Sequence, residues 1–349
     1  MHIIQKLIGA ACFFCCFTAA TFATTGHGVI LMYHHVSDQT PPSTSISAEN
    51  FAKHMQYLAE NHNVVSLPKL IESLKTSSPL PGKAVAITFD DGYQNIAQNA
   101  HPILRKHGFP YTIFINPDVI GNESQQLSWE EVAELQKEGV TFANHTSKHK
   151  HLLLGSEQDD WLDATLKDIE HAEAVLHEKT GHSHKLLAYP YGEYNQALSE
   201  AIQERGYIGF GQHSGAVSSN SNFGALPRFP AAGIYANLDT LKVKLNSLDM
   251  PVIATKIQQP QLTFADRQPT QTVTIETSDI LSNQLACYFE GQQISTQWQQ
   301  SSFTFSFEKP LSVGRSRVNC TAPSQRHQGR FYWFSQPWFV PTEDHQWPD

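Results

Sequence analysis

Ala-Ile-Thr-Phe-Asp-Asp-Gly, at residues 86–92, is a short apolar strand that ends in two adjacent carboxylates and a glycine. Successive strand residues point to opposite faces, so Asp90 and Asp91 can share one site only where the strand ends. Gly92 lets the backbone turn away there. Two carboxylates this close resist ionising together unless a cation lies beside one of them, which leaves the other as a base. The stretch predicts an active-site edge, although a strand followed by an ordinary Asp-Gly turn has the same sequence.

A second motif, Thr-Phe-Ala-Asn-His-Thr-Ser-Lys-His at residues 141–149, follows another candidate strand. Its two histidines, His145 and His149, are four apart, which puts two imidazoles on one side of a helical turn. Neutral imidazole is a common zinc ligand, and two imidazoles with one Asp make a three-ligand site with a position left for water. The chain carries 18 His, so other close pairs, such as 149/151 and 182/184, are expected by chance.

These two motifs, with Leu-Ala-Tyr-Pro-Tyr-Gly at residues 187–192 as a third, resemble those of the polysaccharide deacetylases of the NodB-homology type. The resemblance covers roughly residues 28–235. It implies that Asp90 is the catalytic base. It also implies that a divalent metal, with zinc as the first expectation, is held by Asp91, His145 and His149.

The general acid is expected on an earlier strand, Val-Ile-Leu-Met-Tyr-His-His-Val at residues 29–36. An apolar run that ends in titratable side chains is typical of a barrel strand that delivers a group to the active face. The arrangement resembles the circularly permuted branch of the family that includes the poly-β-1,6-N-acetylglucosamine deacetylases. The resemblance implies that His34 is the general acid, with His35 and the later His213 as alternatives. A histidine without a chemical role is the remaining alternative.

The third motif departs from the family pattern, because it lacks the arginine that steadies the base in the commoner members. Arg228, in Leu-Pro-Arg-Phe-Pro at residues 226–230, could approach the base from another strand. An ordinary surface or ion-paired arginine is the alternative. The family pattern also implies that the Tyr191 backbone N–H stabilises the oxyanion. Tyr189 and His35 complete the candidates for substrate or oxyanion contacts.

Strand-like and helix-like segments alternate up to about residue 250. The expected strands are 85–89, 111–115, 187–189 and 208–210, and the expected helices are 48–60, 128–138, 159–179 and 195–204. Alternation of this kind predicts a parallel α/β sheet or barrel. The family resemblance implies an irregular (β/α) barrel with fewer than eight complete units, with the active groups at the carboxyl ends of its strands.

From about residue 257 the pattern changes to the alternation of β-strands, which predicts a small β-sandwich-like domain. We therefore expect a deacetylase domain at residues 24–252 and a C-terminal domain at residues 253–349. Four of the six Trp lie in this last part. Aromatic faces can stack on sugar rings, but filling a core or an interdomain contact is the favoured role.

The N-terminal segment and the cysteines indicate an exported protein. Residues 1–23 are typical of a secretory signal peptide and are short for a membrane span. Without that segment, two of the five cysteines remain, Cys287 and Cys320, and an even count in an exported chain predicts a disulfide, with free buried thiols as the alternative. We expect a periplasmic or secreted protein without a stable membrane span.

The formal net charge of −9 gives no indication of a basic surface for nucleic acid, and no nucleic-acid partner is expected. The motifs together predict a metal-dependent hydrolase that removes N-acetyl groups from a polysaccharide or oligosaccharide with N-acetylglucosamine units. Two alternatives stay open. One is a carbohydrate O-deacetylase with the same metal site, and the other is a non-catalytic glycan-binding protein.

Overall fold

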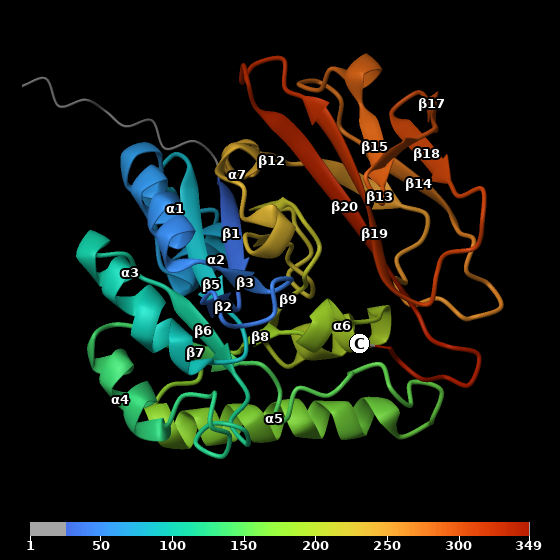
Figure 1. The fold of residues 1–349 in the computed structure, drawn as a ribbon. Helices are drawn as coiled ribbons and strands as arrows, with labels where there is room; N and C mark the ends of the chain where they lie inside the picture. Colours follow the sequence, from blue (N-terminus) through green and yellow to red (C-terminus); the bar gives the residue numbers. More distant parts are fainter. Residues whose placement is uncertain (1–25, 349) are drawn as a thin grey trace, which may run out of the picture.

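The N-terminal two thirds of the chain are built around a curled nine-stranded sheet, seen in a computed structural model that describes residues 26–348 (Figure 1). The expected signal peptide lies outside the described residues. Seven strands follow one another in the order β10 (Ala216–Ser218), β1 (His27–Tyr33), β5 (Ala84–Phe89), β6 (Thr112–Ile115), β7 (Thr141–Asn144), β8 (Leu186–Ala188) and β9 (Ile208–Phe210). All pairs in this order are parallel except β10 with β1. β4 (Asn63–Val64) adds to β5, and β11 (Phe229–Pro230) adds to β1.

The curl of this sheet is visible in side-chain contacts between strands that are not neighbours. The rings of Phe114 on β6 and Phe210 on β9 lie 5.4 Å apart, although β7 and β8 separate these strands in the sheet. Phe210 also bridges to Leu226, a few residues before β11 pairs with β1. The sheet is therefore a curled, incompletely closed barrel, and the predicted mixed α/β architecture is confirmed.

Helices cover the sheet because its central strands are apolar on both faces. Seven α-helices are described: α1 (Ala48–Asn61), α2 (Leu67–Thr76), α3 (His101–His107), α4 (Trp129–Lys137), α5 (Trp161–Thr180), α6 (Gln196–Glu204) and α7 (Leu238–Leu245). The four predicted helices correspond to α1, α4, α5 and α6, with ends that differ by at most two residues. Ser128 and Glu131 form a capping box that fixes the start of α4. The connections contain several short elements. These are the strands β2 (His35–Val36) and β3 (Ser45–Ile46), the short π-helix Ile96–Ala100, and the 3₁₀ helices Pro190–Gly192, Gly233–Tyr235 and Ser282–Gln284.

The last hundred residues form two further sheets. The first has the order β12 (Leu248–Asp249), β20 (Phe331–Val340), β19 (Gly314–Pro323), β15 (Ala286–Phe289) and β16 (Gln292–Ile294). The second has the order β13 (Val252–Thr255), β14 (Thr270–Ile275), β18 (Ser302–Ser306) and β17 (Thr296–Gln299). One apolar core, which includes Ile275, Phe303 and Val318, draws on both sheets. The expected disulfide between Cys287 and Cys320 is present and joins paired residues of β15 and β19.

The two parts of the molecule meet through aromatic side chains and a shared strand pair. Trp333 packs edge-on against Phe229 of β11 with ring centroids 5.0 Å apart, and Phe339 contacts Tyr194 at 5.7 Å. Trp338 is fully buried in the C-terminal core. These aromatics thus have the structural role that the sequence favoured. Within residues 26–348, none of the helices has the combined length and hydrophobicity of a membrane crossing.

Candidate metal centre and active site

The two carboxylates lie at the carboxyl end of β5, where the chain turns sharply. The N–H of Asp90 donates to the Tyr33 carbonyl at 3.0 Å, which continues the β1–β5 pairing by one residue. Asp91 and Gly92 then take positive φ values of 73° and 76°. A Cβ on Gly92 would lie 2.7 Å from Cγ2 of Ile115, so both the conformation and the space require glycine. The turn directs both carboxylates to the same edge of the sheet.

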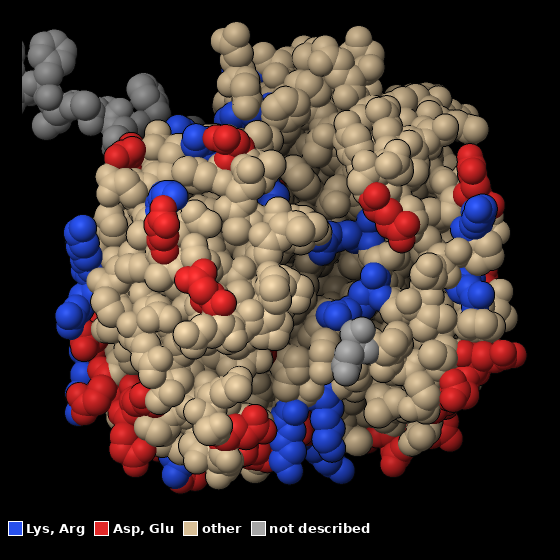
Figure 2. Space-filling model, viewed as in Figure 1, with Lys and Arg blue, Asp and Glu red and all other residues tan. Residues whose placement is uncertain are grey.

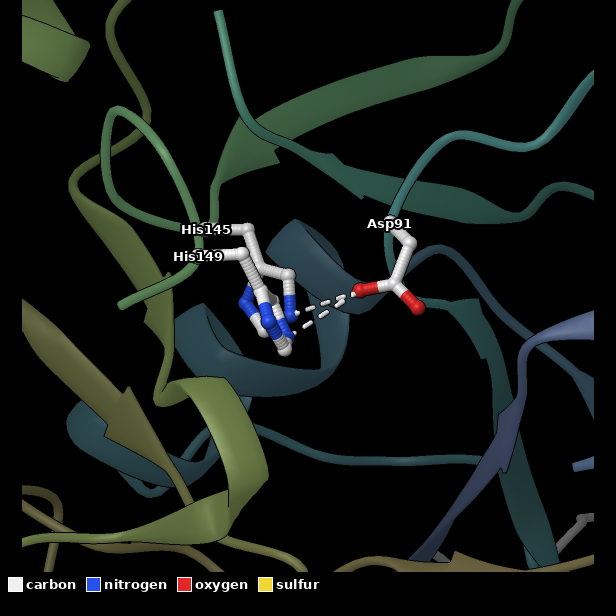
Figure 3. A group of neighbouring side chains, drawn as sticks. All are labelled: Asp91, His145 and His149. Atoms are coloured by element: carbon white, nitrogen blue, oxygen red, sulfur yellow. Dashed lines mark ion pairs between the residues drawn. The ribbon is translucent and has the colours of Figure 1, made fainter. Parts of the chain in front are cut away.

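Asp91, His145 and His149 converge at that edge (Figure 3). Asp91 Oδ1 lies 3.2 Å from His145 Nε2 and 3.3 Å from His149 Nε2, and the three candidate ligand atoms fall within 4.8 Å of one another. The expected helical turn is wrong, because residues 145–149 form a loop after β7. Positive φ values at Thr146 and His149 fold this loop back, and so bring the two imidazoles together without a helix.

The hydrogen bonds of Asp91, His145 and His149 leave atoms that could bind a divalent metal. His145 Nδ1 lies 2.7 Å from the Ala188 carbonyl, which can only accept, so Nδ1 carries a proton and Nε2 is the nitrogen that faces Asp91. His145 Nε2 and Asp91 Oδ1 are both buried, and among the described residues their polar contacts are those within the Asp91, His145 and His149 group. Burial and the neighbouring His145 lower the pKa of His149 to about 4, which favours the neutral imidazole that metals bind.

Asp90 is held by a buried arginine from another strand. Arg228, just before β11, donates from Nη1 and Nη2 to the two Asp90 carboxylate oxygens at 2.6 and 2.8 Å. Both side chains are fully buried. Burial alone would raise the pKa of Asp90, but the Arg228 guanidinium and nearby His145 hold it below its ordinary value. The carboxylate therefore stays ionised and fixed in orientation.

Of the three candidate acids, His34 is the one that the structure brings to Asp90. Its Nε2 lies 4.0 Å from Asp90 Oδ2, and its side chain is 15% exposed. His35 turns away, accepts a hydrogen bond from Asn95 Nδ2 at 2.9 Å and stacks on Tyr93. Burial lowers the pKa of His35 to about 4, with a smaller contribution from the neighbouring His34. His213 is buried beside Tyr194.

The third motif divides between the site and the core. The Tyr191 ring contacts the His149 ring at 4.6 Å, and the residue has a φ of 57°. Tyr189 is not part of this cluster, because its buried hydroxyl donates to the Gly224 carbonyl at 2.6 Å. The close spacing of His149 and His151 was expected to arise by chance, but His151 has structural contacts. It stacks on Tyr191 at 4.0 Å and hydrogen-bonds Glu193 at 2.9 Å.

Sequence reasoning missed three other residues that shape the site. Asn116, at the end of β6 between the two motif strands, donates to the carbonyls of His145 and Thr146. Its only signal is a polar residue directly after a buried strand. Arg315 of β19 donates to the Tyr191 carbonyl at 3.0 Å, and Arg317 donates to the Gln212 carbonyl at 3.1 Å. The residues in each of these two contacts are more than 100 positions apart in the sequence, and no local sequence pattern indicates the contacts.

Comparison with known proteins agrees with this geometry. A match to the family described as polysaccharide deacetylase covers residues 77–209. A Bacillus subtilis protein named as a polysaccharide deacetylase, YxkH, is 32% identical over 203 residues, which are 57% of this chain and 69% of the relative. The chain belongs to the polysaccharide deacetylase family. The family resemblance drawn from the motifs is thereby confirmed.

A further relative is similar to this chain in sequence, and two solved structures are similar to it in fold. A poly-beta-1,6-N-acetyl-D-glucosamine N-deacetylase of Staphylococcus aureus is 30% identical over 207 residues, covering 56% of this chain and 71% of the relative. The structure of Streptococcus pyogenes deacetylase PplD in complex with acetate matches with a TM-score of 0.57 and 22% identity, over 64% of this chain and 99% of that one. IcaB from Ammonifex degensii matches with a TM-score of 0.56 and 22% identity, over 63% of this chain and 97% of that one. These structural matches establish the fold, and leave about a third of this chain outside it.

Proposed function

We propose that this member of the polysaccharide deacetylase family is a metal-dependent hydrolase that removes N-acetyl groups from a glycan containing N-acetylglucosamine. The observation that carries the proposal is the convergence of Asp91, His145 and His149 beside an Asp90 that Arg228 holds ionised. The S. aureus relative, whose name gives this activity on a β-1,6-linked N-acetylglucosamine polymer, supports the choice of substrate class.

The proposal also includes a division into two domains and a location outside the cytoplasm. Residues 24–252 would form the deacetylase domain and residues 253–349 a second, all-β domain, which the separate C-terminal core supports. The signal-like residues 1–23 and the disulfide support export to the periplasm or the exterior, where a cell-envelope or matrix glycan is accessible.

A divalent ion, zinc first, would be held by Asp91 Oδ1 and the Nε2 atoms of His145 and His149. When bound, such an ion polarises the acetyl carbonyl and lowers the pKa of water. The Ala188 carbonyl fixes the tautomer of His145, and the Asn116 amide holds the backbone of the His145 loop. These neighbours fix the orientation of the His145 imidazole and of the loop that carries it.

Asp90 would accept the proton of the attacking water. Both of its oxygens receive hydrogen bonds from Arg228, so the carboxylate cannot rotate away from the reacting centre. His34, 4.0 Å from Asp90 Oδ2, would give a proton to the departing sugar amine. If the family pattern transfers, the Tyr191 backbone N–H would stabilise the oxyanion, and Arg315 would steady that peptide from its carbonyl side.

The purified chain without residues 1–23 should release acetate and free amine in equal amounts from one of three substrates. These are a β-1,6-linked N-acetylglucosamine oligomer, a chitin oligomer and a peptidoglycan fragment. A chelator should abolish release, and Asp90→Asn is the control for contaminating enzyme. Acetate without free amine from an O-acetylated glycan would identify an O-deacetylase. Glycan binding without release of either product would identify a binding protein.

A further inference from the structure

A groove of about 760 Å³ runs between the deacetylase part and the C-terminal sheets. Its volume is in the range of about 300–1,000 Å³ that is usual for small-molecule sites. One wall comes from loops after the large sheet and from α7, and the other comes from β19, β20 and the turn after β15. The lining residues used below are Tyr191, Tyr235, Lys244, Glu290, Arg315 and Arg317.

The groove is basic, although the whole chain is acidic. Lys and Arg side chains gather in the hollow between the two parts of the molecule (Figure 2). Among the described residues, Lys244, Arg315 and Arg317 form no ion pair, and Glu290 is the one carboxylate in the lining. The formal net charge of the chain is −9, so this excess of positive charge is local.

Tyr235 contacts two of the cations of the groove, Arg317 and Lys244. Arg317 donates from Nη2 to the Tyr235 hydroxyl at 2.9 Å, and Lys244 Nζ lies 4.6 Å from the centre of the same ring. Burial and the nearby Arg317 lower the pKa of Lys244 to about 8, so its charge is retained at neutral pH. Side chains held in this way cannot swing away from a cation that enters the groove.

One side chain, Tyr191, lies between the groove and the triad of Asp91, His145 and His149. The Tyr191 ring lines the groove and also contacts His149, 4.6 Å between centroids. The Arg315 guanidinium lies 5.1 Å from the centre of that ring. A glycan with one acetyl group at the triad would therefore place its neighbouring sugars along the groove.

The reaction changes the charge of the sugar. An N-acetylated sugar is neutral, whereas its product carries a primary amine that is protonated near neutral pH. Two like charges about 12 Å apart at the edge of a protein, where the effective dielectric constant is about 20, weaken binding by about tenfold. A sugar that has already been processed is therefore disfavoured in this groove, whereas an acetylated one is not.

We propose that the groove between the deacetylase part and the C-terminal sheets binds N-acetylated sugars beside the reacting one and excludes sugars that have lost their acetyl group. This inference rests on the proposed deacetylase function. It predicts that the enzyme leaves a glycan partly acetylated, because a processed sugar blocks attack on its neighbour.

Binding is measured with the Asp90→Asn chain, which cannot turn over its ligand, at about pH 6.5 and low salt. Fully N-acetylated and fully de-N-acetylated pentasaccharides of glucosamine are the two probes. We expect the acetylated probe to bind about tenfold more tightly. Adding Lys244→Gln and Arg317→Gln should reduce the preference to less than about threefold, as should high salt. Lys244→Arg with Arg317→Lys should retain it, which separates charge from packing.

Lys242→Gln is the matched control, because this lysine lies on the same helix but pairs with Asp239 and does not line the groove. Equal binding of both probes to the Asp90→Asn chain would overturn the proposal. So would tighter binding of a carboxylate-bearing glycan that is lost in the double variant, since the groove would then be a site for acidic sugars. Acetate release by the unmodified chain is assayed in parallel. Its absence would refute the proposed function, whereas release with equal binding would refute the groove alone.

Discussion

Asp90 and Arg228 form an ion pair with no exposed surface on either side chain. Removing both charges from water is costly, and their attraction and two hydrogen bonds offset that cost. Arg228 also donates to the Gly211 carbonyl and lies over the Phe114 ring, so it has little freedom to move. The base thereby gains one fixed orientation and depends strongly on its partner.

Arg228→Met should lower the free energy of unfolding by about 3–5 kcal/mol, because it leaves the Asp90 charge buried and unpaired. Adding Asp90→Asn to the same chain should recover part of that loss, since the amide carries no charge. Urea unfolding of the parent, both single variants and the double variant gives the coupling between the two residues. Additive losses would show that the two side chains do not depend on each other.

Variants of the metal ligands and a variant of the base should differ in how much metal they bind. Asp91→Ala, His145→Ala and His149→Ala should each lose bound metal, because one of three protein ligands is removed. Asp90→Asn should keep its metal and lose turnover, since the ligands stay intact. Metal per chain is measured after dialysis against a weak chelator. Full occupancy in the two histidine variants would disprove the ligand assignment.

His34 can be tested through the leaving group. An amine departs poorly unless it is protonated, whereas an activated phenolate departs without help. His34→Ala should keep most hydrolysis of an activated aryl acetate and lose roughly 10²-fold or more on an N-acetylated sugar oligomer. Rates on both substrates decide the matter, with His35→Ala as the matched control because that ring faces Asn95. Equal slowing on the two substrates would make His34 a structural or substrate-binding residue.

The turn after β5 depends on Gly92, and substituting this glycine should destabilise the turn. Gly92→Ala must accept both a φ of 76° and a Cβ 2.7 Å from Ile115. Gly139→Ala has an even larger φ of 92° but nothing within 4 Å of its Cβ, so it measures the backbone cost alone. We expect about 1 kcal/mol of destabilisation for Gly139→Ala and about 2–4 kcal/mol, with weaker metal binding, for Gly92→Ala. Thermal unfolding of both variants checks this, and equal losses would exclude a steric role for Ile115.

Elements with a strong local pattern could be predicted from the sequence, and those set by distant contacts could not. Apolar runs marked β5 and β9, and amphipathic spacing marked α1 and α5 to within two residues. The loop that carries His149 was mistaken for a helical turn, because a spacing of four suits both and only the positive φ values distinguish them. Arg228 could be named as a candidate but not placed, since its contact with Asp90 spans 138 residues.

The whole molecule is tied together by contacts that cross residue 252. Trp333 packs on Phe229, Phe339 packs on Tyr194, and β12 pairs with β20. A chain cut after residue 252 would expose Phe229, which is fully buried in the intact protein. We expect the truncated chain to be mostly insoluble, because large apolar contacts between parts are lost. The soluble fraction after expression measures this. Soluble truncated protein with full activity on short oligosaccharides would contradict it.

The pairing of β12 with β20 has a consequence for how such a protein can change over generations. Leu248 and Asp249 belong by sequence to the first part of the chain but complete a ladder in the second. An exchange of the last hundred residues for an unrelated module would leave this short strand without its neighbour and the Tyr191 and Gln212 carbonyls without the arginines of β19. A substitution on either side of the join therefore has to fit both parts of the molecule.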